Sequence, residues 1–252
     1  MLLAAFVSFR RDLSPDECFK LEQLKNVSIA HLENGRHKEK RGAGQGDLAK
    51  ADAGFVELAA KLPGDPLGPR NLAIARLLEL QEKLIAPQRA LEAADLLLKL
   101  ENDSASGHLL AGRLAQAAGD KARADAEFAK AAELAPTDAA IWYAISRVWL
   151  DSPDDADQKR GHEALGRAYQ AAPDNLFLQQ AWLSAQAQAH DPGIAETLRQ
   201  FRQLLAARPG LVENMRKHAR IADPLAFVDG ALAAADKGQS AAAEGQARQL
   251  AN

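Results

Sequence analysis

The feature that most constrains this chain is a motif of small and large residues that returns along it. Its clearest copy reads HLLAGRLAQAAGDKARADAEFAKAAELAPTD, from His108 to Asp138. Small residues, one aromatic and a closing proline stand at offsets 0, 7, 12, 16, 19 and 24, at Gly112, Gly119, Ala124, Phe128, Ala131 and Pro136. A motif that returns at a fixed period indicates a repeat architecture, so the first question is its period.

Equivalent positions recur at close to one period. Leu100 and Leu134 are 34 residues apart, whereas Pro136, Pro173 and Pro209 follow one another at 37 and 36 residues. Short insertions account for the longer spacings. A single repeat cannot bury its apolar face alone, but stacked neighbours form a continuous core. We therefore predict an all-α fold of stacked helix pairs.

Proline and glycine positions predict where the helices begin and end. Starts are expected where serine or aspartate precedes proline and can cap the free amides, at Ser14, Ser152, Asp191 and Asp223. Ends are expected at Asn34-Gly35 and Ala118-Gly119. The predicted pairs are 15–34 with 47–62, 69–83 with 87–100, 104–118 with 120–134, 138–150 with 153–171, and 174–189 with 192–207. A short basic helix over 211–222 and two helices around Lys237-Gly238 follow.

Composition supports closely packed helices and disfavours a nucleic-acid partner. Apolar residues make up 47% of the 252 residues, which is enough for a core, and aromatic residues only 5%. Alanine dominates, and it has the highest helix propensity. With 31 basic and 34 acidic side chains the net charge is −3, so no basic field is available for a phosphate backbone.

The ends of the chain and its cysteine give weaker information. Cys18 is the only cysteine, which excludes an internal disulfide and a multi-thiolate zinc site, and we expect a small buried side chain there. The opening MLLAAFVSF is too short to span a bilayer, and it fits either the remnant of an export signal or a misplaced start site. The last helix reaches Asn252 without a polar closing segment, which predicts more protein beyond it.

A glycine-rich stretch, RGAGQGD, from Arg41 to Asp47, suggests a phosphate-binding loop. A dinucleotide fingerprint requires G-x-G-x-x-G after an apolar strand, but here GRHKEK precedes the glycines. A P-loop sequence is also absent. We therefore expect a flexible loop that lengthens the turn of the first pair, and no nucleotide cofactor.

Three acidic or histidine-rich stretches invite a metal hypothesis and fail its spacing requirements. His31 and His37 are six residues apart across a predicted helix end, and His162-Glu163 lacks a second histidine at the zinc-protease spacing. The segment 151–163 is acidic but does not place glycine and glutamate as a calcium loop requires. Neither a G-x-S-x-G motif nor a base near Cys18 indicates catalysis. We predict no metal site and no enzyme.

The unit from His108 to Asp138 resembles the tetratricopeptide (TPR) repeat, with His108 where the usual tryptophan stands. The similarity covers about residues 15–210 and departs at the first and last units. It implies a right-handed α-solenoid whose first helices, the A helices, line a concave surface that binds proteins or peptides. It also implies that the large residues at motif positions hold helices together, namely Phe128, Trp142, Trp149, Leu165 and Trp182.

Positions on successive A helices give the expected binding residues. The residue after Gly112 is Arg113, and 34 residues before and after it stand Glu79 and Arg147. Two arginines one repeat apart form a candidate clamp for a carboxylate or an acidic peptide. The same side of the helices carries Tyr143, Gln180 and Ser184. The alternative is that Glu79 pairs with Arg113 in a merely solvated groove.

The predicted organisation is an apolar segment over 1–14, a TPR array over 15–210 and irregular or truncated helices over 211–252. HLENGR and DPLGPRNLAIARL are also similar to the TPR segment that precedes an FG-GAP propeller in bacterial exported proteins. The favoured function is a protein- or peptide-binding scaffold. A recruitment module of a larger enzyme or envelope protein and a self-assembling array stay open, as do a cytoplasmic and an envelope location.

Overall fold

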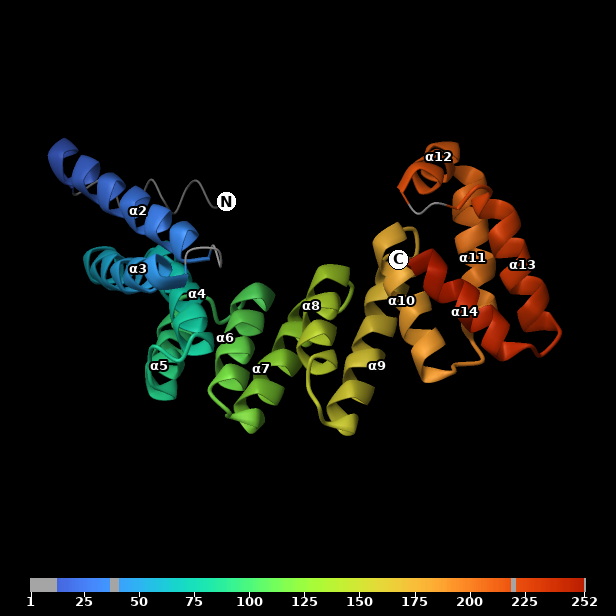
Figure 1. Ribbon diagram of the computed structural model, residues 1–252. Helices are drawn as coiled ribbons and strands as arrows, with labels where there is room; N and C mark the ends of the chain where they lie inside the picture. The colour runs from blue at the N-terminus through green and yellow to red at the C-terminus, as the bar shows by residue number, and fades with distance from the viewer. Residues whose placement is uncertain (1–12, 37–40, 219–220, 252) are drawn as a thin grey trace. The chain divides into compact units, whose positions relative to one another are not determined.

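The computed structural model describes residues 13–36, 41–218 and 221–251, which form thirteen helices and no strand (Figure 1). The prediction of an all-α helical-repeat fold is confirmed. Among these helices none is long and apolar enough to cross a bilayer. The helices are α2 (Pro15–Arg36), α3 (Arg41–Lys61), α4 (Leu67–Gln81), α5 (Pro87–Leu98), α6 (Ala105–Ala117), α7 (Lys121–Leu134), α8 (Ala139–Leu150), α9 (Asp155–Ala171), α10 (Leu176–Ala189), α11 (Ile194–Ala207), α12 (Pro209–His218), α13 (Pro224–Asp236) and α14 (Ser240–Ala251).

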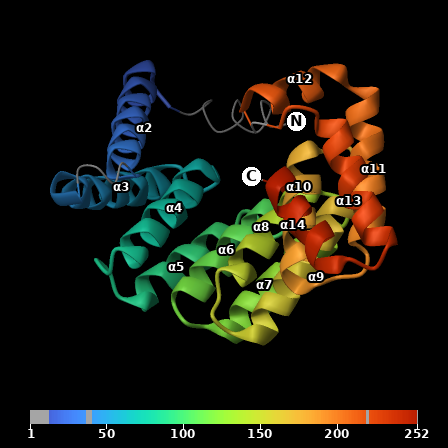
Figure 2. The same cartoon turned by 45° about the vertical axis from the view of Figure 1, so that its right-hand side comes forward.

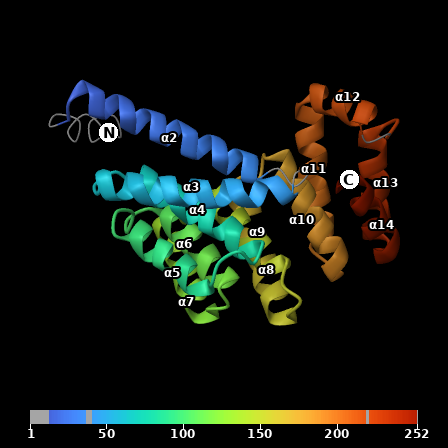
Figure 3. The ribbon, with the colours of Figure 1, turned by 60° about the vertical axis from the view of Figure 1, so that its left-hand side comes forward.

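The helices divide into two compact units, one ending at Pro136 and the other beginning at Thr137. In the first unit each helix from α2 to α7 packs against the next, and α4 also packs against α6 (Figure 3). Contact between alternate helices as well as consecutive ones is the arrangement of stacked helix pairs. The predicted division of the chain at residue 210 stays a prediction.

A glycine sets the distance between α6 and α7. A Cβ atom on Gly112 would lie 2.6 Å from the ring of Phe128, which is 3% exposed. The absent side chain therefore lets the aromatic ring of α7 lie directly on the backbone of α6. In the second unit Gly161 of α9 plays the same part against α8, because a Cβ there would lie 2.8 Å from the Leu150 amide nitrogen.

The second unit closes on itself after α9. Helix α11 packs on α10 and α13, and α14 packs on α13 and returns to α10, so that four helices surround one core (Figure 2). Its fully buried members include Leu183, Leu198, Phe201, Val228 and Leu250. Helix α14 buries its apolar face against α10 and α13. The expectation that more protein follows the last helix stays a prediction.

The large residues that the motif places between helices fall into two groups. Phe128, Trp149 and Leu165 are each 3% exposed and belong to the core as predicted. Trp142 and Trp182 are half-buried. The guanidinium of Arg167 lies 5.1 Å from the Trp142 ring centroid, and Trp182 stacks on Tyr169 with centroids 6.3 Å apart.

Several helix termini form as the sequence indicates. The Ser14 hydroxyl accepts from the Glu17 amide at 3.3 Å, while the Glu17 carboxylate accepts from the Ser14 amide at 2.9 Å, a reciprocal capping box. Asp223 caps α13 through the Ala226 amide at 3.1 Å. Gly119 adopts φ +82° directly after α6, as a helix-ending glycine does.

Other termini differ from the prediction by a few residues. Asp154, rather than Ser152, caps α9, accepting from the Ala156 amide at 2.8 Å. Asn34 and Gly35 lie inside the last turn of α2 rather than ending it. Both differences are shifts within the expected turns and leave the pairing of helices unchanged.

The glycine-rich stretch is helical, which corrects the expectation of a loop. Helix α3 begins at Arg41 and contains all three glycines. The same helix buries Leu48, Ala51 and Phe55, and Asp47 Oδ1 lies 2.7 Å from His31 Nδ1 of α2. This packing outweighs the helix propensity of glycine, which is about 1 kcal/mol poorer than that of alanine. A helical backbone at this position does not form a phosphate-binding loop.

Candidate functional site

A half-buried tyrosine and an exposed phenylalanine form an aromatic pair on α8 and α10 of the second unit. Tyr143 of α8 meets Phe177, in the first turn of α10, with ring centroids 5.0 Å apart and planes at 76°. Phe177 is 56% exposed, although aromatic side chains are usually buried. Edge-to-face contact fixes both rings, which leaves a preorganised apolar surface available to a partner.

Arg147 stands one helical turn after Tyr143 on α8. Its side chain is 55% exposed, and its Nη2 lies 3.2 Å from Asp151 Oδ1 on the same helix. An exposed pair of this kind contributes only about 0.3–0.5 kcal/mol. The guanidinium can therefore exchange this carboxylate for one from a ligand with little loss of stability.

The two predicted residues on α10 are already engaged inside the unit. Gln180 donates from Nε2 to the Leu250 carbonyl of α14 at 2.8 Å, and Ser184 Oγ lies 3.5 Å from Gln188 Nε2. Arg248 of α14 likewise donates to the Ala187 carbonyl at 2.8 Å. Helix α14 thus occupies the side of α10 on which a ligand was expected.

Glu79 lies inside the first unit rather than on its surface. It is 3% exposed on α4, and no side chain or backbone group in the described parts of the chain forms a hydrogen bond with its Oε2. Burial raises the pKa of its carboxyl group, the Asp52 carboxylate raises it further, and the guanidinium groups of Arg89 and Arg76 act in the opposite direction. A ligand in an open groove would not reach this carboxylate.

The buried polar cluster around Glu79 is held by Asp52 of α3. Arg76 Nε donates to Asp52 Oδ1 at 2.7 Å, and Arg89 Nη2 donates to Asp52 Oδ2 at 2.8 Å. Arg76 also donates from Nη1 to the Arg89 carbonyl at 2.8 Å. The cluster therefore ties α3, α4 and α5 together, and its arginines are not free to bind a ligand.

Arg113 is exposed on α6, and no ion pair joins it to Glu79 among the described side chains. The structure therefore does not contain the alternative pair of Glu79 and Arg113. Arg113 belongs to the first unit and Arg147 to the second. The clamp formed by both arginines stays a prediction.

The histidines that prompted a metal hypothesis have ordinary partners. His31 contacts Asp47, His162 Nδ1 lies 2.9 Å from the Gln158 carbonyl, and His37 lies outside the described residues. Asp154 and Asp157 belong to the capped start of α9. Within the described parts of the chain, no group of three or more histidine, cysteine or acidic side chains could hold a metal ion.

Phe177 is the member of the surface that sequence reasoning missed. Its signal was available, since it precedes Gln180 by three residues and therefore shares its helix face. An apolar side chain at the first turn of a helix is usually assigned to the core. Only the structure shows that more than half of this ring is exposed.

Comparison with known proteins yields a fold likeness alone. No protein-family model matches the chain, and no curated protein matches it. A crystal structure of MamA is 18% identical and covers 69% of this chain and 95% of that one, with a TM-score of 0.46. A second structure of the MamA protein is 18% identical and covers 76% and 95%, with a TM-score of 0.45. A likeness at this level carries no argument about partners or activity.

Proposed function

We propose that this chain is a protein-interaction scaffold that recognises a partner through the A helices of its second unit. The observation that carries the proposal is the exposed ring of Phe177, held edge-to-face by the half-buried Tyr143, with exposed Arg147 one helical turn after Tyr143. Aromatic and arginine side chains supply most of the binding energy at protein interfaces, and they do so best when they are fixed before the partner arrives.

The partner that suits this surface carries an acidic group next to an apolar or aromatic side chain. Arg147 can bind a carboxylate with two parallel hydrogen bonds, while the rings cover the neighbouring apolar atoms. Arg113 extends the same preference if it lies along the path of the partner, as the repeat spacing predicts. Gln180 and Ser184 then act as the boundary of the surface, since α14 engages Gln180.

Capture experiments with matched variants test the proposal. The wild-type chain, Phe177→Ala/Arg147→Glu and Lys159→Glu are immobilised and exposed to the same cell extract, with captured proteins identified by mass spectrometry. Lys159 is exposed on α9 and matches Arg147 in the charge change. We expect the double variant to lose partners by at least about tenfold, the usual effect of removing hot-spot residues, and the control to keep them.

A second pair of variants tests the arginine clamp separately. Arg113→Glu alone and Arg113→Glu/Arg147→Glu distinguish a partner that spans both residues from one that touches Arg147 only. If the proteins captured by the wild type are also captured by Phe177→Ala/Arg147→Glu, the proposed surface is not the binding site. If Arg113→Glu leaves capture unchanged while the variants that contain Arg147→Glu reduce it, the proposed surface binds the partner without the arginine clamp.

A further inference from the structure

The first unit contains a pocket of about 860 Å³ that none of the predicted binding residues lines. It lies between the first half of α2, the turn from α3 to α4 and the turn from α5 to α6. Ligand sites in proteins usually measure about 300–1,000 Å³. The size suits an inserted group of several side chains.

One side of the pocket is apolar. It is formed by the start of α2, the end of α3 and the residue after α5, with the side chains of Leu13, Cys18, Leu21, Leu58, Leu62 and Leu100. Leu100 is 36% exposed, and Cys18 is half-buried. Apolar side chains left in contact with water around a concavity favour insertion of an apolar group.

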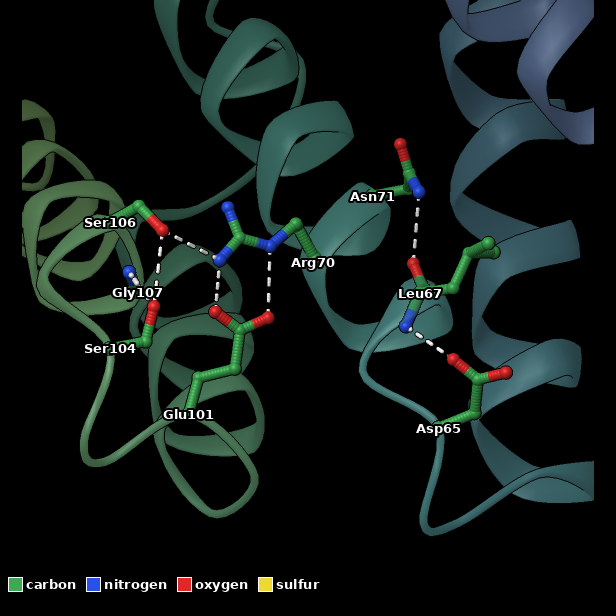
Figure 4. A network of polar contacts seen from close by, with 8 residues as sticks. All are labelled: Asp65, Leu67, Arg70, Asn71, Glu101, Ser104, Ser106 and Gly107. Carbon is green, nitrogen blue, oxygen red and sulfur yellow. Dashed lines mark hydrogen bonds and ion pairs between the residues drawn. The ribbon is translucent and has the colours of Figure 1, made fainter. Parts of the chain in front are cut away.

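The rest of the lining contains a fixed polar network (Figure 4). Arg70 of α4 donates from Nε to Glu101 Oε1 at 2.9 Å and from Nη2 to the other carboxylate oxygen. The same Nη2 lies 3.0 Å from Ser106 Oγ, and Ser104 caps α6 through the Gly107 amide at 3.1 Å. The charge of Arg70 is therefore neutralised within the wall.

Among the described lining residues, the charge that remains is negative. Besides the Arg70–Glu101 pair, the charged ones are Lys25 and three acids, namely Glu22, Asp65 and Asp103. Lys25 lies 3.9 Å from Glu22. Asp103 is exposed, and Asp65 Oδ1 accepts from the Leu67 amide at 2.8 Å. A cationic ligand group is therefore favoured here, in contrast to Arg147.

An uncharged acceptor completes the site. Asn71 uses its amide nitrogen to donate to the Leu67 carbonyl at 2.9 Å (Figure 4). Its side-chain oxygen accepts no hydrogen bond among the described residues, and Asn71 belongs to the lining of the pocket. An acceptor of this kind suits a backbone N–H of an inserted peptide, because it fixes orientation without adding charge.

We propose that this pocket is a second binding site, which takes an apolar peptide segment of a partner protein with a lysine or arginine directly beside it. The apolar wall receives the segment, and the carboxylates of Asp65 and Asp103 receive the basic side chain. The site does not depend on the surface at Tyr143 and Phe177, since it lies in the other unit and selects the opposite charge.

Cys18 gives a direct test, because it is the only cysteine of the chain and lines the pocket. The rate at which a thiol reagent modifies Cys18 is measured in the full chain with the capped heptapeptide Leu-Leu-Ala-Leu-Leu-Lys-Lys. The matched probe ends in Glu-Glu instead. At a basic-peptide concentration about ten times its Kd, we expect labelling about tenfold slower, since only the unoccupied fraction reacts. The acidic peptide should protect much less.

A pair of charge variants locates the selectivity. Asp103→Lys should raise the Kd of the basic peptide about fivefold, as expected for roughly 1 kcal/mol of lost attraction, so that protection at the same peptide concentration falls. Glu82→Lys makes the same charge change at an exposed residue outside the pocket and should leave protection unchanged. The peptide comparison on the wild-type chain needs no variant, so a folding defect in either variant would not obscure the result.

Three outcomes would overturn the proposal. Equal protection by both peptides would show that the pocket does not select a cation. Absence of protection by either peptide would show that it takes no such segment. If Cys18 reacts only after Phe6→Ser/Phe9→Ser is introduced, the apolar residues at the start of the chain are its occupant and the partner is excluded.

Discussion

The two units begin with the same kind of helix pair and finish differently. In the first, helices follow one another from α2 to α7, and α4 packs on α6 as repeats do. In the second, α14 returns to α10, so that α10, α11, α13 and α14 enclose a core of their own. The first unit therefore keeps the repeat pattern, whereas the second changes it into a closed bundle.

The two units differ in which helix covers the exposed face of a neighbouring helix. A repeat must cover the face of its neighbour, and the helix after it normally supplies that cover. On α10 the cover comes from α14, through the Gln180–Leu250 contact and the buried Leu250 side chain. The surface that we propose for a partner is therefore the edge at Tyr143 and Phe177, rather than the whole A-helix face.

The largest expected effect comes from truncating one fully buried phenylalanine in each unit. Phe55 and Phe201 are both 0% exposed. Phe55→Ala and Phe201→Ala should each cost about 3–5 kcal/mol of unfolding free energy. Hydrogen exchange with mass spectrometry should show protection lost from α2–α5 in the first variant and from α10–α14 in the second. Equal losses in both units for either variant would mean that they unfold as one.

A smaller effect on the free energy of unfolding should distinguish a glycine at a close helix crossing from a glycine with open space around it. A Cβ at Gly112 would meet the Phe128 ring, whereas nothing lies within 4 Å of one at Gly245 of α14. Gly112→Ala should destabilise by about 1–3 kcal/mol through overpacking. Gly245→Ala should stabilise by up to about 1 kcal/mol, since alanine is the better helix former. Chemical denaturation measures both, and an unchanged midpoint for Gly112→Ala would contradict the crossing.

The hydrogen bond from Gln180 to α14 should make a modest contribution to the free energy of unfolding of the second unit. Gln180→Ala removes the donor to the Leu250 carbonyl, which should cost about 0.5–1.5 kcal/mol. Faster hydrogen exchange should be confined to α14 and the face of α10. Gln188→Ala, at an exposed residue of the same helix, serves as the control and should change little. If both variants behave alike, Gln180 does not hold α14.

The smallest expected change has the opposite sign and concerns the buried acid of the first unit. Because burial raises the pKa of Glu79, its ionisation opposes folding, and this loss of stability sets in as pH rises through the raised value. Glu79→Gln should therefore be more stable than the wild type at pH 8, with the difference vanishing near pH 4. Thermal unfolding across that range measures it. A variant less stable at pH 8 would mean that Arg76 and Arg89 outweigh desolvation.

Local rules were enough to place most helices. Serine before proline at Ser14 and aspartate before proline at Asp223 cap the helices that they were expected to cap, and Gly119 ends α6. Such features act within a few residues, so the sequence carries them directly. The repeat marks Gly112 and Phe128 as motif positions, and the structure adds that the Phe128 ring lies against Gly112.

Burial and long-range packing were decided by the tertiary structure. Repeat spacing placed Glu79 beside Arg113 on a common face, but the Asp52 cluster shows Glu79 to be internal. Propensity assigned Gly42–Asp47 to a loop, but packing of α3 on α2 keeps it helical. The cover of α14 over α10 joins residues 70 positions apart, as Gln180 and Leu250 show. Periodicity reports which side chains share a helix face, whereas only the folded chain determines what covers that face.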